Sequence, residues 1–188
     1  MFCFHQLNNQ STQYLTCFYN ILEQMKFGMT NAQLTQSISH NFIVQMIPHH
    51  LAAIEMSKNV LLYTTCRPLQ QIANHIIVSQ TNSISNMQSI LDHCEAHCNT
   101  AEELQLYQRR INLVINRMFS LMGGAPETNQ ISKNFMKEMI PHHEGAIEMS
   151  KNALKYDICP ELIPILCSII SSQQKGVQEM QALLRCDF

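Results

Sequence analysis

The stretch that decides the fold is FIVQMIPHHLAAIEM, residues 42–56, which returns as FMKEMIPHHEGAIEM, residues 135–149. In both copies apolar residues recur at the i, i+3, i+4 and i+7 spacing of an amphipathic helix. A proline stands inside each helical pattern and is followed directly by two histidines. Because a proline removes a backbone donor, we expect each helix to bend beside its histidines.

The repetition extends well beyond this motif. At an offset of 93 residues, residues 42–91 align with residues 135–184 without a gap, and half of the aligned residues are identical. The same offset pairs Tyr14 with Tyr107. The sequence therefore predicts a single helical domain, residues 1–188, built from an internal repeat of residues 12–92 and 104–185.

Each repeat predicts three helices and no strand. The first helix covers residues 12–27 and 101–122, the middle helix carries the MIPHH motif, and the third covers about residues 68–90 and 160–184. No segment shows the alternation of a strand. The predicted fold class is all-α, a helical bundle in which the two repeats pack together.

The composition narrows the choice of partners. Only 14% of the residues are charged, the formal net charge is −2, and no block of lysine or arginine occurs. A nucleic-acid or anionic membrane surface would require such a basic block, so neither partner is expected. No apolar run is long enough to span a membrane.

The eight cysteines are expected to be reduced. The first 13 residues, MFCFHQLNNQSTQ, lack the basic and apolar regions of a signal peptide, so the sequence predicts a cytoplasmic protein. Thiols stay reduced in that compartment, which favours core thiols or metal ligands over disulfides. The cysteines are Cys3, Cys17, Cys66, Cys94, Cys98, Cys159, Cys167 and Cys186.

The repeated motif predicts a site for a soft metal ion. At about 100° per residue, its two histidines and two methionines lie within an arc of roughly 120° on one helix face, around a small alanine. Imidazole and thioether groups suit copper, especially Cu(I), whereas hard cations prefer carboxylates and carbonyls. Affinity should fall as the histidines protonate, below about pH 6. The predicted ligands are His49, His50, Met46, Met56, His142, His143, Met139 and Met149.

A second interpretation of the same pattern is structural. Methionines at apolar positions are common core residues, and buried histidines often only satisfy hydrogen bonds. A duplicated chain also preserves the residues that its packing requires. The alternative function is therefore a structural or protein-interaction bundle in which the two histidines are a core packing feature.

The motif F-x-x-x-M-I-P-H-H-x-x-A-I-E-M resembles the family catalogued as domain of unknown function 305, and the resemblance covers both repeats. It implies a ferritin-like four-helix bundle and, from some members, copper binding through histidine and methionine. The family's third helix reads Q-x-x-E-I-x-x-M-x-x-W-L, but here Ser83 and Gly176 replace its glutamate, and Ile90 and Leu183 its tryptophan. No carboxylate ligand is expected from that helix. Further thioether candidates are Met25, Met29, Met118, Met122, Met87 and Met180.

A second group of candidate ligands lies between the repeats, where the chain reads His93-Cys94-Glu95-Ala96-His97-Cys98. If the third helix continued through this segment, His93/His97 and Cys94/Cys98 would form i,i+4 pairs. Two thiolates and two imidazoles would suit zinc or Cu(I). The alternative is a frayed helix end with reactive thiols.

Catalytic motifs are missing from the sequence. No glutamate has a histidine three residues later, as a di-iron bundle requires, and HExxH, CxxC, P-loop and GxSxG patterns do not occur. The leading prediction is a non-enzymatic protein that sequesters or buffers copper. The sequence leaves open which metal is native, whether the motifs share one site, and whether a homo-oligomer completes the coordination.

Overall fold

The computed structural model describes residues 6–186, and within this range it contains helices and no strand. The helices are α1 (Asn9–Thr30), α2 (Ile38–Leu61), α3 (Arg67–Glu95), α4 (Ala101–Gly123), α5 (Ile131–Ala153) and α6 (Leu162–Arg185). The predicted all-α fold is confirmed. Three helices fall in each predicted repeat, which is compatible with the duplication read from the sequence.

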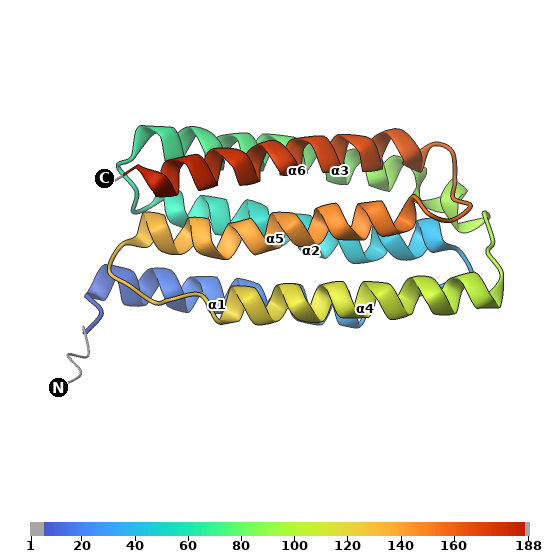
Figure 1. The fold of residues 1–188 in the computed structure, drawn as a ribbon, viewed down its shortest axis with the longest axis horizontal. Coiled ribbons are helices and arrows are strands. Elements are labelled where there is room, and N and C mark those ends of the chain that lie inside the picture. The colour runs from blue at the N-terminus through green and yellow to red at the C-terminus, as the bar shows by residue number, and fades with distance from the viewer. Residues whose placement is uncertain (1–5, 187–188) are drawn as a thin grey trace.

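The helices are arranged in three layers (Figure 1). The α2–α5 pair forms the middle layer, α1 and α4 pack on one side of it, and α3 and α6 pack on the other. Two four-helix bundles therefore share the α2–α5 pair. The two sides of α2 and α5 that face these layers are consequently covered, so the polar residues on those sides must find partners inside the molecule.

The helix ends follow from local hydrogen bonds. A capping box starts α4, because the Thr100 N–H donates to the Glu103 carboxylate at 2.9 Å and the Glu103 N–H donates to the Thr100 hydroxyl. The predicted bounds of the third helices need two corrections. Helix α3 continues past Ile90 to Glu95, and α6 begins at Leu162, after the predicted Pro160. The Cys159 N–H donates to the Ser39 hydroxyl at 2.9 Å, which holds the segment before α6 as a loop against α2.

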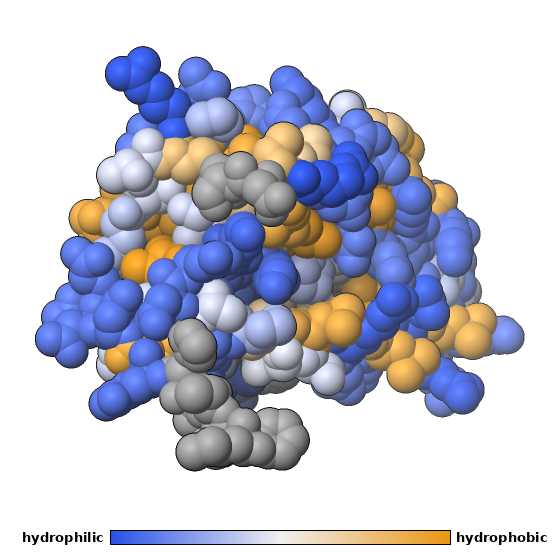
Figure 2. Space-filling view, turned by 60° about the vertical axis from the view of Figure 1, so that its left-hand side comes forward, coloured by the Kyte–Doolittle hydropathy of each residue, from blue (hydrophilic) through white to orange (hydrophobic). Residues whose placement is uncertain are grey.

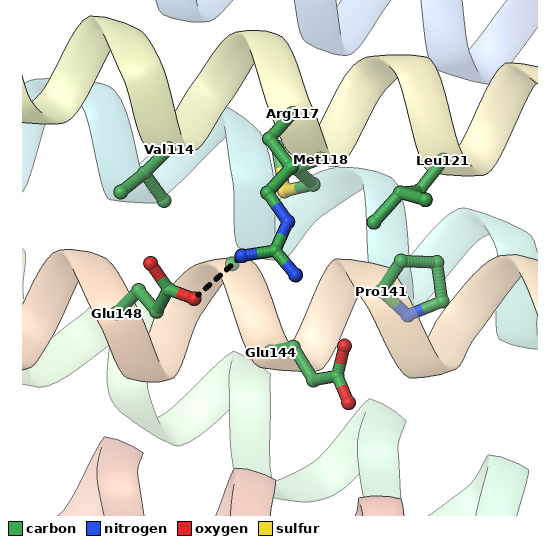
Figure 3. A pocket seen from close by; sticks show the side chains of 8 residues that line it. Val114, Arg117, Met118, Leu121, Pro141, Glu144 and Glu148 are labelled. Atoms are coloured by element: carbon green, nitrogen blue, oxygen red, sulfur yellow. Dashed lines mark ion pairs between the residues drawn. The ribbon is translucent and has the colours of Figure 1, made fainter.

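Helices α2 and α5 continue through their prolines. Pro48 packs on α1 at Gly28, where an added Cβ would lie only 2.7 Å from the proline Cβ, so glycine permits the close approach of these helices. Figure 3 shows the equivalent place in the second repeat, where Pro141 faces Leu121 of α4. The prolines thus face the α1–α4 layer.

The surface is mixed in character. Figure 2 shows a face that is mostly hydrophilic, with apolar residues in separate areas. Phe27, Leu62 and Val78 are the most exposed large hydrophobic side chains of the described residues. Within residues 6–186, no helix is both long and apolar enough to cross a membrane.

The cysteines of the described range are free thiols, as the sequence predicts. Cys94 and Cys159 are buried, Cys66 is half-buried, and the others are exposed. Cys3 lies outside the described residues.

Candidate functional site

The four motif histidines lie at the centre of the molecule, on the two helices of the middle layer. The side chains of His49, His50, His142 and His143 are all buried, with at most 2% exposed. Since α2 and α5 pack directly on each other, the motifs of the two repeats meet there. The fold therefore brings together residues that are 93 positions apart in the chain.

His49 and His142 form a stacked pair. Their ring centroids are 3.6 Å apart, with an angle of 31° between the planes. The Nε2 atom of His49 bonds to the His142 carbonyl at 3.2 Å, and the Nε2 atom of His142 bonds to the His49 carbonyl at 3.1 Å. Because a carbonyl only accepts, each Nε2 must carry the hydrogen. In the neutral ring the lone pair is then on Nδ1.

His50 and His143 lie outside this pair and contact α3 and α6. The His50 Nε2 atom is 3.1 Å from the Ser83 hydroxyl. An added Cβ at Gly176 would lie 2.8 Å from His143 Cδ2 and 3.0 Å from its Nε2, so only glycine leaves this imidazole its space. Ser83 and Gly176 are the two positions at which the resemblance stated above implies a glutamate. Each thus lies against the second histidine of a motif.

The Nδ1 atoms of all four rings are buried and have no hydrogen-bond partner among the described residues. Buried polar atoms are nearly always paired, because leaving one unpaired costs on the order of 1–3 kcal/mol. Four unpaired nitrogens in one place therefore require an explanation. An imidazole nitrogen with a free lone pair is a ready metal ligand, particularly when the other nitrogen is fixed by a carbonyl.

Burial keeps these imidazoles neutral. It lowers the pKa of His50 to about 3 and that of His142 to about 4, and it lowers the pKa of His49 and His143 well below the ordinary value. Repulsion from His142 adds to the lowering for the other three. The neutral form is the one that binds metal. The loss of affinity predicted below about pH 6 is thus expected at a lower pH, where the folded protein protonates.

The motif methionines lie in the same core as the histidines. At most 1% of each residue among Met46, Met56, Met139 and Met149 is exposed. In the region the structure describes, no three of the four imidazoles bring nitrogen atoms within 4.8 Å of one another. A metal held here could therefore not rely on a three-histidine site, and thioethers would have to complete its ligands.

A polar groove between α3 and α6 reaches His50. Its volume is about 210 Å³, and Ser79, Ser83, Asn86, Ser168 and Ser172 are among its lining residues. Gln80 and Gln173 also line it, and both have buried amide atoms without a partner in the described part of the chain. This groove could not be predicted from the sequence, because it arises only when α3 and α6 pack side by side.

A buried glutamate on α5 was likewise not predicted from the sequence. The Tyr14 hydroxyl donates to Glu138 Oε2 at 2.6 Å, and only 2% of Glu138 is exposed. Burial raises the pKa of Glu138 to about 8, although the Tyr14 hydrogen bond opposes the shift. Gln45 occupies the equivalent position of the first repeat. A neutral glutamine at the position equivalent to Glu138 was the one sign in the sequence that this side chain could be buried and neutral.

Replacing Glu138 with glutamine should remove a loss of stability at alkaline pH. The folded-state pKa of Glu138 is raised, so its stabilising protonated form is fully present below about pH 4.5 and is lost as the pH rises through about 8. Between about pH 6.5 and 8 the parent should lose on the order of 1–2 kcal/mol of unfolding free energy, whereas Glu138→Gln should lose little. Urea unfolding at several pH values measures this. Exposed Glu144→Gln, on the same helix, is the control, and an unchanged slope in Glu138→Gln would contradict the assignment.

The predicted second cluster is not built on one helix. Helix α3 ends at Glu95, so His97 and Cys98 lie beyond it, and the predicted i,i+4 pairs do not form within a helix. His97 instead pairs with Asp157 at 3.3 Å, and Cys98 is exposed. His93 approaches Glu161, from the loop before α6, at 3.2 Å.

Comparisons with known proteins agree with this fold. A family model described as domain of unknown function (DUF305) matches residues 22–91 and 39–184. The crystal structure of a DUF305 fragment from Deinococcus radiodurans aligns with a TM-score of 0.57 and 21% identity, covering 81% of this chain and 97% of that one. At this identity the likeness shows the fold alone.

A relative in sequence is Uncharacterized protein L153 of Acanthamoeba polyphaga mimivirus. It is 51% identical over 47 residues, which make up 25% of this chain. The match spans 31% of the length of that relative.

Proposed function

This chain belongs to the DUF305 family, and we propose that it sequesters or buffers a soft metal ion, copper as Cu(I), through histidine and methionine side chains. One observation carries the proposal. Four buried imidazoles meet at the α2–α5 contact, and each has an Nδ1 atom without a hydrogen-bond partner among the described residues. Buried neutral imidazoles supply lone pairs at neutral pH without first losing a proton.

The surrounding chemistry favours a soft ion. The motif methionines are buried with the histidines, and thioether sulfur prefers Cu(I) to hard cations. The buried side chain of Glu138 already accepts a hydrogen bond from Tyr14 of α1. The residues of α3 and α6 that lie against His50 and His143 are Ser83 and Gly176, and neither carries a carboxylate. Hard cations require several oxygen ligands, so this site should bind them weakly.

The groove between α3 and α6 supports a route for the ion. It connects exposed Asn82 and Asn86 with buried His50 through Ser83. Its hydroxyl and amide groups would let a hydrated ion approach the buried rings without crossing apolar surface. In this proposal His50 receives the ion first, and the inner rings and thioethers hold it.

An anaerobic titration of reduced protein with Cu(I), against a competing chelator, tests the proposal. Replacing His49, His50, His142 and His143 together should abolish tight binding. Because the inner rings also pack the core, a second variant with Met46, Met56, Met139 and Met149 changed to leucine should retain the fold and lose about 10–100-fold in affinity. Both variants are made with Cys94→Ser and Cys159→Ser, since thiolates bind Cu(I) strongly.

The matched control is Met136→Leu, a buried methionine of α5 that is not among the candidate ligands. It should bind copper like the parent. Copper should also raise the melting temperature of the parent, because a ligand bound only by the folded state stabilises it. Unchanged stoichiometry and affinity in the histidine and methionine variants would refute the site.

The stacked pair favours a second candidate function. His49 and His142 hold α2 against α5 by ring contact and two reciprocal hydrogen bonds. A structural or protein-interaction bundle would use the pair only as this connection. It would show no stabilisation by copper.

A further inference from the structure

A second group of ligand-type side chains joins the end of α3 to the loop before α6. Ligand atoms of His93, Cys159 and Glu161 all lie within 4.8 Å of one another. The His93 Nε2 atom is 3.2 Å from Glu161 Oε1, and the Cys159 thiol donates to Glu161 Oε2 at 3.1 Å. The cluster thus joins two segments that lie 66 residues apart in the chain.

These separations suit a tetrahedral ion. Ligand atoms placed about 2.0–2.3 Å from zinc lie roughly 3.3–3.8 Å from each other, which requires only small side-chain movements here. Thiolate, imidazole and carboxylate are the three ligand types that zinc uses in proteins. His93 and Glu161 are exposed, so their side chains are free to adjust, while Cys159 is fixed in the interior.

A second thiol lies beside this group. Cys94 precedes the last residue of α3 and is fully buried. Burial raises the pKa of the Cys94 thiol, and a hydrogen bond with the Cys159 thiol adds to this rise. The Cys94 carbonyl also accepts from the Ser37 hydroxyl at 2.6 Å, and the Cys159 N–H donates to Ser39, so the start of α2 holds both backbones in place.

We propose that His93, Cys159 and Glu161 form a zinc site, separate from the proposed copper site, that clamps the end of α3 to the loop before α6. On binding, the Cys159 thiol proton passes to solvent and the sulfur coordinates as a thiolate. The ion takes one ligand from α3 and two from the loop before α6. It therefore stabilises the contact between α3 and α6, which also forms the polar groove.

This ligand set is not repeated in the other half of the duplicated chain. At the offset of 93 residues, Cys159 corresponds to Cys66, but Glu161 corresponds to Pro68 and His93 to Cys186. The equivalent place in the first repeat therefore lacks both the carboxylate and the imidazole. Cys66 is the natural control, because it is the repeat partner of a proposed ligand in a position that should not bind zinc.

The test is a titration of the reduced, metal-free protein with Zn²⁺ against a chromophoric chelator, repeated with Co²⁺ as a spectroscopic probe. The parent should bind one zinc ion at this site and show a thiolate-to-cobalt charge-transfer band. Cys159→Ser and His93→Ala should each lose more than the roughly 10–100-fold in affinity that loss of a supporting residue costs.

Two control variants should bind zinc like the parent. One is Cys66→Ser, and the other is His75→Ala, which changes an exposed histidine of α3, the helix that carries His93. A His50→Gln, His143→Gln variant should also keep the cobalt band, which separates this site from the copper site. Absence of the band in the parent, or equal zinc affinity in Cys159→Ser and His93→Ala, would overturn the proposal. Since His93 is exposed, its variant tests the site without disturbing the core.

Discussion

Below about pH 5 the metal-free protein is expected to unfold cooperatively, and its four motif imidazoles should together take up about four protons on unfolding. The four motif imidazoles are buried and neutral, and burial holds their pKa values below the ordinary 6.5. A depressed folded-state pKa gives stability that is present above about pH 6.5 and is lost as the pH falls toward the folded value. As the pH falls, the histidines of the unfolded chain are protonated before those of the folded protein, which shifts the folding equilibrium toward the unfolded state.

The expected size is large. At about pH 4.5, two units below the ordinary pKa of histidine, each imidazole lowers the unfolding free energy by on the order of 2–3 kcal/mol. Four together give roughly 10 kcal/mol, which is comparable to the whole stability of a typical domain, about 5–15 kcal/mol. Acid should therefore unfold the protein within a narrow range of pH.

Glu138 opposes part of this change. Its pKa is raised to about 8, so protonation between about pH 8 and 4.5 stabilises the folded state. The net uptake between about pH 6.5 and 4.5 should thus be closer to three protons than to four. Circular dichroism as a function of pH, with the proton uptake derived from the slope, measures the transition.

The controls use the difference between buried and exposed histidines. A His50→Gln, His143→Gln variant should reduce the proton uptake by about two and move the midpoint to lower pH. His75→Ala, an exposed histidine, should leave the transition unchanged. If the double variant unfolded with the same slope and midpoint as the parent, these rings would not be the groups that titrate.

Much of the fold could be predicted from the sequence because the signals were local or periodic. The 93-residue offset and the helical spacing of apolar residues gave the all-α fold. The end of α3 was misplaced because the residues after Ile90 include polar and charged types that read as an ending, although the helix continues with Cys94 facing the interior.

The geometry of the site could not be predicted, because it depends on how helices meet. The helical wheel placed His49 and His50 on one helix face. In the packed structure His49 contacts α5, whereas His50 forms a hydrogen bond with Ser83 of α3. Likewise, the sequence paired His93 with His97 on one helix. Its partner Glu161 lies 68 residues further along the chain and becomes a neighbour only when α3 packs on α6.

The second large effect is expected from the stacked pair. His49→Ala should remove an aromatic side chain from a fully buried position and leave the His142 carbonyl without its donor. By analogy with other buried aromatic rings, the loss should be about 3–5 kcal/mol, and His142→Ala should lose a similar amount.

Because each ring packs on the other and bonds to the other's backbone, the two losses should not add. Once one ring is absent, the second has lost its stacking partner already. The double variant should therefore be more stable than the sum of the single changes implies, by about 1–2 kcal/mol. Urea unfolding of the metal-free single and double variants at about pH 7 completes the cycle.

His50→Ala paired with His142→Ala serves as a control with weaker coupling, since these rings do not stack. Additive losses of unfolding free energy for His49→Ala and His142→Ala would contradict the pairing. Coupling without metal, together with stabilisation by copper in the parent alone, would assign the stacked rings two roles: they hold α2 against α5, and they present their Nδ1 lone pairs to the ion.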